Sequence, residues 1–197
     1  MRIGIISDVH GDLEALEATL QKLQDEHQVT YVLCAGDLVG RGPEQNRVVE
    51  VHRDFGIIAV CGNHDEAFSG ITKENAAYLR SLPIDWQGSL GGKRFFMCHG
   101  KPGNNMWGMY RDHVSGTYLT MVLNSLKCDV LITGHTHVPL YLRGKAGCIL
   151  NPGSLYTFES ARATSHTYGV LNLPDLSFEL FDSRVGELVT PQSWRVS

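Results

Sequence analysis

Histidine and carboxylate side chains recur next to glycine in the first two thirds of the chain, and five of the nine histidines belong to this set. Neutral imidazole and carboxylate groups are the usual protein ligands of transition-metal ions such as zinc, manganese and iron. Histidines scattered over a surface would not collect in this way. The residues concerned are Asp8, His10, Asp37, Asn63, His64, His99, His135 and His137. The pattern predicts a metal centre built from several separate segments.

Two of these segments carry a pair of candidate ligands separated by one residue. In extended backbone, residues i and i+2 point to the same side, so Asp8 with His10, and His135 with His137, are each expected to present two ligands together. Glycine beside each ligand lets the main chain crowd a small ion cluster. A carboxylate has two oxygens and can bridge two ions, whereas a neutral imidazole has one free lone pair. We therefore expect one of the aspartates to bridge two ions.

The candidate ligands follow short apolar runs that are typical of buried strands. These predicted strands span residues 2–6, 30–36, 56–62, 94–100 and 129–135. Helices are predicted behind Asp12, which can cap the first of them, after Pro43, and over residues 72–82 and 115–126. In open α/β sheets, functional groups collect beyond the carboxyl ends of the strands. The alternation of strand and helix therefore predicts that the candidate ligands meet at one edge of a sheet.

The last third of the chain is predicted to be mostly β. Short strands are expected at residues 148–154, 167–173 and 177–182, with residues 172–177 as a hairpin connection. No repeat or low-complexity tract separates the two parts. The organisation predicts one α/β domain over residues 1–197.

Composition excludes some classes of protein and leaves others open. The chain has 17 Lys+Arg and 21 Asp+Glu, a formal net charge of −4, whereas proteins whose main partner is nucleic acid usually carry a cationic surplus. We therefore expect no stable nucleic-acid complex. The five cysteines include no CxxC pair, which favours buried thiols in a reducing compartment. No apolar run approaches the roughly 20 residues of a membrane span, and the first residues do not resemble a signal peptide. We predict a cytoplasmic protein without a membrane partner, and leave a homo-oligomer open.

The ordered series of motifs resembles the calcineurin-like metallophosphoesterase superfamily, whose pattern is DxH, GD, GNH, a single H, and GHxH. All five parts occur in that order between residues 8 and 137, and the NPGS segment at residues 151–154 looks like the one that follows in small single-domain bacterial and archaeal members. The resemblance implies a four-layer αββα sandwich of two mixed β-sheets flanked by helices. It also implies a two-metal centre between the sheets.

The resemblance assigns a role to each of these residues. One ion would be held by Asp8, His10, Asp37 and His137, and the other by Asp37, Asn63, His99 and His135, with Asp37 as the bridge. His64 would be the catalytic imidazole rather than a ligand. The expected cofactors are two divalent ions, manganese first, although mixed nitrogen and oxygen ligation also admits iron, zinc, cobalt or nickel.

These expectations point to a metal-dependent phosphoesterase that uses activated water, and the preference for phosphodiesters comes from the resemblance alone. A small phosphoester or nucleotide-like molecule would be the substrate. A phosphomonoesterase acting on proteins or small metabolites is the alternative enzyme. The segment from Gly36 to Gly42 is similar to the GDxxDRG segment of Ser/Thr protein phosphatases, but Gly40 stands where those enzymes have Asp. A metal-retaining protein-binding scaffold is the other alternative, and the intact His64 argues against it.

Several further residues have two interpretations. Arg41 and Asn63 are the expected substrate-binding residues, with Arg41 as a phosphate clamp or, alternatively, a solvated loop arginine. Asp65 is considered as an orienting partner of His64. The segment 101–113, with its Met, Trp, Tyr, Lys and Arg side chains, either stacks a base and grips the phosphoester or packs against the protein shell or a second subunit. The remaining histidines are expected to be ordinary surface residues: His27, His52, His113 and His166.

Overall fold

The computed structural model describes residues 1–66, 69–156 and 165–191, and in this part of the chain the strands form two five-stranded sheets. The first sheet has the order β10-β9-β1-β2-β3. Its central strand β1 pairs in parallel with β2 and antiparallel with β9, so the sheet is mixed. The strands are β1 (Arg2–Ile6), β2 (Tyr31–Cys34), β3 (Ile58–Ala59), β9 (Thr167–Asn172) and β10 (Ser177–Asp182).

The second sheet has the order β4-β5-β6-β8-β7 and is also mixed. Strands β5, β6 and β8 run parallel to one another, while β4 and β7 pair antiparallel at the two edges. The strands are β4 (Asp85–Leu90), β5 (Lys93–Cys98), β6 (Val130–Ile132), β7 (Leu140–Gly144) and β8 (Gly147–Asn151).

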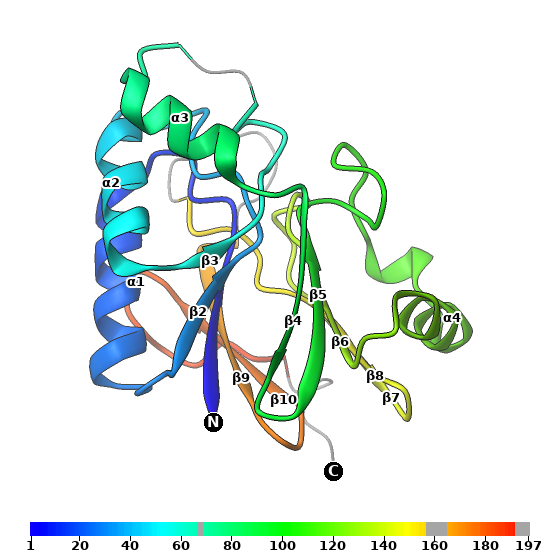
Figure 1. Ribbon diagram of the computed structural model, residues 1–197. Coiled ribbons are helices and arrows are strands. Elements are labelled where there is room, and N and C mark those ends of the chain that lie inside the picture. Colours follow the sequence, from blue (N-terminus) through cyan, green and yellow to red (C-terminus); the bar gives the residue numbers. More distant parts are fainter. Residues whose placement is uncertain (67–68, 157–164, 192–197) are drawn as a thin grey trace.

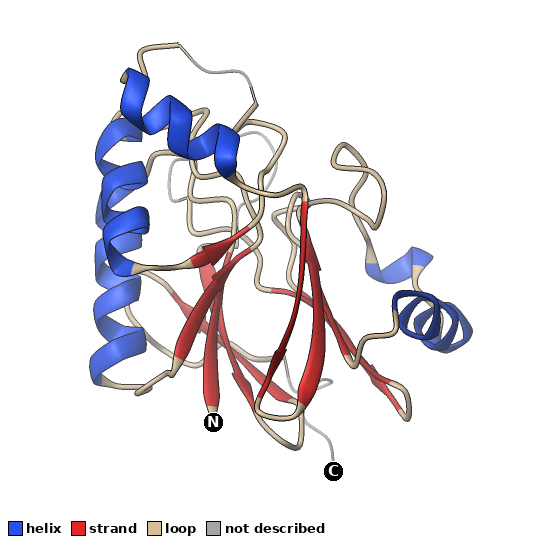
Figure 2. Cartoon of the chain, viewed as in Figure 1, coloured by secondary structure: helices blue, strands red, loops and turns tan. Residues whose placement is uncertain are grey.

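Helices cover the outer faces of both sheets (Figure 1, Figure 2). On the side of the first sheet lie α1 (Leu13–Asp25), α2 (Gln45–Phe55) and α3 (Lys73–Ser81). On the side of the second sheet lies α4 (Gly116–Leu126), which follows a short 3₁₀ turn at Arg111–His113. The layers are therefore helix, sheet, sheet and helix, which confirms the αββα sandwich.

Three layers of apolar side chains hold this sandwich together. In β1, Ile3 and Ile5 point into the space between the sheets, whereas Ile6 packs towards α1 and α2. In β5, Phe95 and Met97 point inwards and Phe96 packs towards α4. A strand that is covered on both faces must be apolar on both faces. This explains why the strands that lead to the candidate ligands are almost continuously apolar.

Hydroxyl and carboxylate side chains cap α1, α3 and α4, as the sequence predicts for the first of them, whereas α2 has no side-chain cap. Asp12 accepts a hydrogen bond from the backbone N–H of Ala15 at 3.1 Å. Thr72 and Ser115 play the same role at the starts of α3 and α4. Each cap satisfies a backbone donor that the helix leaves unpaired.

The structure differs from the sequence prediction at the sheet edges and in strand length. The edge strands β4 and β7 were not predicted, because β4 has the polar sequence DWQGSL and is only half buried. The runs at 30–36 and 56–62 contain shorter strands, because the chain leaves the sheet early to form the loops that carry Asp37 and Asn63. The hairpin connection between β9 and β10 is confirmed.

The five cysteines are buried and free, in agreement with the prediction of core thiols. None of the helices in the described ranges combines the length and the apolar character that crossing a membrane requires.

The prediction that His52 is a surface residue was wrong. Its side chain, on α2, is fully buried, and Nδ1 lies 2.9 Å from the hydroxyl of Tyr78 on α3. Burial lowers the pKa of His52 to about 3. The imidazole is therefore neutral in the folded protein and packs as an uncharged core residue between α2 and α3.

Replacing His52 by glutamine is expected to make folding less sensitive to acid. The unfolded chain binds a proton at this imidazole below a pH of about 6.5, whereas the folded chain excludes it until about pH 3. The contribution of the neutral His52 imidazole to the free energy of unfolding is therefore fully present above pH 6.5 and is lost as the pH falls towards 3. Between pH 6.5 and 4.5 the metal-free wild type should lose about 2–3 kcal/mol more than His52→Gln. Urea unfolding of both proteins across this range measures the difference, and parallel profiles would refute it.

Candidate metal centre

All seven predicted metal-ligating side chains lie close together. They come from the loops that follow β1, β2, β3, β5 and β6. Their ligand atoms include two groups, and within each group all the atoms lie within 4.8 Å of one another. The first group contains Asp8, His10 and His137, and the second contains Asp8, Asp37 and His99. Asn63 and His135 lie against the second group, as described below. The structure thus brings together every residue that the sequence nominated as a ligand.

In the first group, two imidazole nitrogens and a carboxylate oxygen face one another. His10 Nε2 lies 3.1 Å from His137 Nε2, which in turn lies 3.2 Å from Asp8 Oδ1. His10 Nδ1 donates to the carbonyl of Val39 at 3.1 Å. Burial lowers the pKa of His10 to about 4. In the neutral ring the proton sits on Nδ1, so the Nε2 lone pair is left pointing into the group.

In the second group, His99 is oriented in the same way. Its Nδ1 donates to the carbonyl of Ala35 at 2.7 Å, and its Nε2 lies 3.3 Å from Asp37 Oδ2 and 3.0 Å from Asn63 Oδ1. Asn63 Oδ1 also lies 2.9 Å from Nδ1 of His135. Burial acts to lower the pKa of His99, but the carboxylates of Asp37 and Asp8 and the hydrogen bond to Ala35 together outweigh it and raise the pKa to about 9.

Asp37 belongs to the second group and also faces the first. Its Oδ2 is 3.7 Å from His10 Nε2 in the first group and 3.3 Å from His99 Nε2 in the second. Its Oδ1 is directed away and accepts a hydrogen bond from the backbone N–H of His64 at 2.9 Å. This is the position that a bridging carboxylate would occupy.

Asp8 provides the test of whether these residues fit a metal ion. Its Oδ2 accepts hydrogen bonds from Ser7 Oγ at 2.6 Å and from the backbone N–H of His135 at 3.1 Å. Its Oδ1 is buried and lies 3.2 Å from Nε2 of His137, but it accepts no well-aligned hydrogen bond within the described part of the chain. A buried charged oxygen that no hydrogen bond satisfies is costly, and a cation among imidazole nitrogens would satisfy it. The donor set, carboxylate, amide oxygen and imidazole, suits divalent transition metals.

The expectation that the paired ligands lie on extended backbone was wrong. Five candidate ligands have positive φ angles between 52° and 66°. They are Asp8, His10, Asp37, His135 and His137. The left-handed conformation costs a non-glycine residue roughly 1–2 kcal/mol, and it turns His135 towards the second group while His137 faces the first. The two members of that pair therefore serve different halves of the site.

Glycine next to the ligands makes the predicted close approach. A Cβ atom on Gly62 would clash with Oδ1 of Asp37, and one on Gly134 would clash with Oγ of Ser7. At both positions glycine is required because a larger side chain would clash, and not because the backbone makes a turn. These two glycines let the loop that carries Asn63 pack on Asp37, and the loop that carries His135 pack beside Asp8.

His64 lines the pocket above the two groups. Its ring meets that of His10 edge-on, with 5.1 Å between the centroids, and no hydrogen bond to the ring occurs within the described residues. Gly40, with φ of 118°, packs on this ring, because a Cβ there would lie 2.8 Å from Nδ1 of His64. An aspartate at position 40, as in Ser/Thr protein phosphatases, would not fit this arrangement.

Asp65 does not orient His64, contrary to the role considered from sequence. Its buried carboxylate accepts hydrogen bonds from four backbone N–H groups at 2.8–3.2 Å, those of Asp37, Leu38, Val39 and Gly62. Burial and the neighbouring Asp37 carboxylate raise the pKa of Asp65 to about 6. Asp65 instead ties the Asp37 loop to the Asn63 loop.

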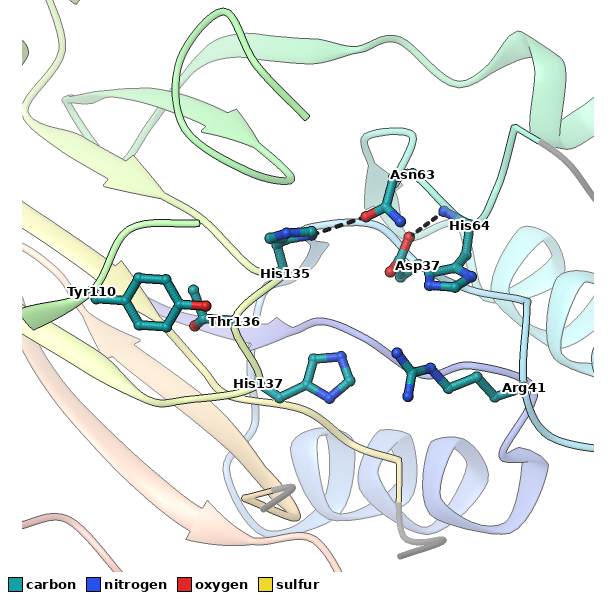
Figure 3. Close-up of a pocket in the computed structure, with 8 residues that line it drawn as sticks. All are labelled: Asp37, Arg41, Asn63, His64, Tyr110, His135, Thr136 and His137. Carbon is teal, nitrogen blue, oxygen red and sulfur yellow. Dashed lines mark hydrogen bonds between the residues drawn. The ribbon is translucent and has the colours of Figure 1, made fainter. Parts of the chain in front are cut away.

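A pocket of about 130 Å³ opens over the centre (Figure 3). Four candidate ligands line it together with His64, with Arg41 at one end and Tyr110 and Thr136 at the other. These ligands are Asp37, Asn63, His135 and His137. Thr136 was not predicted, although it stands between two predicted ligands. Lys101 and Arg111 do not line the pocket: the former lies over the Trp107 ring, and the latter donates to the carbonyl of Val114.

Comparisons with known proteins agree with this geometry. The calcineurin-like phosphoesterase superfamily domain matches residues 1–175. Phosphodiesterase YfcE of Escherichia coli is 30% identical over 192 residues, which cover 90% of each chain. A symmetrical bis(5′-nucleosyl)-tetraphosphatase of Hamiltonella defensa is 36% identical over 85 residues, 40% of this chain and 31% of that one. The crystal structure of a hypothetical protein from Pyrococcus horikoshii has a TM-score of 0.77 at 19% identity, covering 92% of this chain and 87% of the other. The chain belongs to the calcineurin-like phosphoesterase superfamily and is a metal-dependent phosphoester hydrolase.

Proposed function

We propose that the chain hydrolyses small phosphodiesters at a centre of two divalent metal ions. One ion would be held by Asp8, His10, Asp37 and His137, and the other by Asp37, Asn63, His99 and His135. The observation that supports this most is the arrangement around Asp37. Its Oδ2 lies between imidazole nitrogens of both groups, while a second buried carboxylate oxygen, Asp8 Oδ1, faces Nε2 of His137 and accepts no well-aligned hydrogen bond among the described residues.

The charge of such a centre suits an anionic substrate. Asp8 and Asp37 contribute two negative charges against the four positive charges of two divalent ions, and the other ligands are neutral. The centre would therefore be the most positive place on a chain whose formal net charge is −4. A phosphoester would be drawn to it.

The side chains around the pocket have distinct roles in this proposal. Divalent ions at such a centre supply a Lewis acid for the phosphate and lower the pKa of water. His64, whose ring is free of other hydrogen bonds in the described structure, would donate a proton to the leaving oxygen. Arg41, at one end of the pocket, would pair with phosphate oxygens through its guanidinium group. The Asn63 amide, beside His64, would contact the substrate as well as a metal ion.

The preference for diesters is supported by the similarity to phosphodiesterase YfcE, a relative that matches almost the whole chain. The tetraphosphatase match is shorter and supports a small nucleotide-like substrate. A protein-binding scaffold without activity is disfavoured, because His64 is present and lines the pocket.

Hydrolysis of bis-p-nitrophenyl phosphate and of p-nitrophenyl phosphate, compared at the same Mn²⁺ concentration, tests the proposal. We expect faster turnover of the diester, loss of activity of the apoprotein after chelation, and recovery when Mn²⁺ is restored. Full activity in excess EDTA would refute the metal centre, and faster turnover of the monoester would identify a phosphomonoesterase instead.

A further inference from the structure

The pocket over the candidate metal centre is too small to hold more than the reacting part of a substrate. Its volume of about 130 Å³ falls below the roughly 300–1,000 Å³ of sites that bury most of a drug-sized ligand. A phosphoester bound there must therefore extend over the rim. The rim differs at its two ends, with the guanidinium of Arg41 at one and the aromatic ring of Tyr110 at the other (Figure 3).

Tyr110 is held at its end by contacts of the preceding segment, residues 101–110, here called the 101–110 loop. Asn105 in this loop donates to the carbonyl of Cys61, two residues before Asn63, at 3.0 Å. Gly108 packs on the segment that contains His135, because a Cβ on Gly108 would clash with the Thr136 side chain. The loop is thus attached to two segments that carry candidate ligands, and its position relative to the centre is fixed.

Within the 101–110 loop, Tyr110 is the aromatic residue that lines the pocket. Its side chain is 42% exposed, and the same Gly108 Cβ would lie 3.4 Å from its ring. Trp107 and Met106 are each 64% exposed but do not line the pocket, and the Trp107 ring is already covered by the Lys101 ammonium at 4.5 Å. When a planar apolar group stacks on a half-exposed aromatic ring, both remove apolar surface from water.

We propose that Tyr110 selects phosphoesters that carry a planar aromatic group, such as a phenyl ring or a nucleobase. This aromatic arm is the substituent of the phosphate that points away from Arg41. The proposal rests on the proposed function, because it assumes that the phosphate binds over the metal centre. The phosphate end would face the ions and Arg41, and the aromatic arm would stack on the Tyr110 ring as it leaves the pocket. Stacking of this kind tolerates different rings, since each has a π face.

Binding of two non-hydrolysable probes to the Mn²⁺-loaded protein, measured by calorimetry, tests Tyr110 directly. Phenylphosphonate and methylphosphonate share the phosphonate group and differ in their single arm. We expect the wild type to bind phenylphosphonate roughly fivefold or more tighter. Tyr110→Leu should reduce this preference to less than twofold, and Tyr110→Phe should keep it.

Trp107→Leu is the matched control, because it removes an exposed aromatic ring from the same loop but outside the pocket. It should keep the wild-type preference. The proposal is overturned if Tyr110→Leu also keeps that preference, if Trp107→Leu loses it, or if Tyr110→Phe loses it and so assigns the effect to the hydroxyl. Because the readout is binding, a protein that discriminates between the probes but hydrolyses no diester would refute the proposed function and leave this inference standing.

Discussion

Replacing Asp37 by alanine is expected to deplete both metal ions and to abolish phosphoester hydrolysis. Asp37 Oδ2 lies within 3.7 Å of His10 Nε2 and 3.3 Å of His99 Nε2, so its loss removes a ligand from both proposed sites. Every other proposed ligand serves one ion. Metal content by elemental analysis should fall from about two ions per chain to well below one.

Two further variants make the Asp37 result specific. Asp37→Asn keeps an oxygen that can accept from the backbone N–H of His64 and removes only the charge, so it should fold normally and still bind metal weakly. Asp12→Asn removes the same charge from an aspartate that caps α1 and is not among the proposed ligands, and it should keep both ions. An Asp37→Ala protein with full occupancy would show that another residue joins the ions.

Replacing His64 by alanine is expected to reduce turnover by roughly 10²–10⁴-fold while metal content stays normal. The imidazole lines the pocket and belongs to neither of the two groups of candidate ligands. Its loss therefore removes a proton donor from the reaction without removing a metal ligand. The reduction should appear in kcat more than in KM, because proton donation matters in the transition state.

The control for His64 is His27→Gln, since His27 contacts Tyr168 and Phe181 and does not line the pocket. This variant should keep both the metal and the activity of the wild type. Loss of metal from His64→Ala would make His64 a ligand, and turnover close to that of the wild type would remove it from the catalytic residues.

The layers of the fold and the convergence of the candidate ligands could be predicted from sequence because both depend on local patterns. Apolar runs that end at glycine and a polar residue mark buried strands, and Asp8, Asp37 and His99 follow such runs. The sequence could not reveal how His135 and His137 separate. Their left-handed backbone depends on how the loops pack together. The prediction that both side chains point to the same side assumed extended backbone, which these residues do not have.

The remaining differences have a common physical origin in contacts between distant segments. His52 is buried because α3 covers α2, which the sequence around position 52 does not reveal. Asp65 bonds backbone N–H groups of a loop that lies 26 to 28 residues earlier in the chain. Tyr110 reaches the pocket because Gly108 lets the loop lie on Thr136. Composition indicated an aromatic segment there, but not which ring faces the site.

Anomalous diffraction from crystals of the protein with Mn²⁺ tests whether two metal ions are bridged by Asp37. Two anomalous peaks are expected: one beside Asp8, His10 and His137, the other beside Asn63, His99 and His135. Asp37 should contact both. A single peak, peaks away from these side chains, or two peaks without Asp37 between them would contradict the bridged two-metal centre.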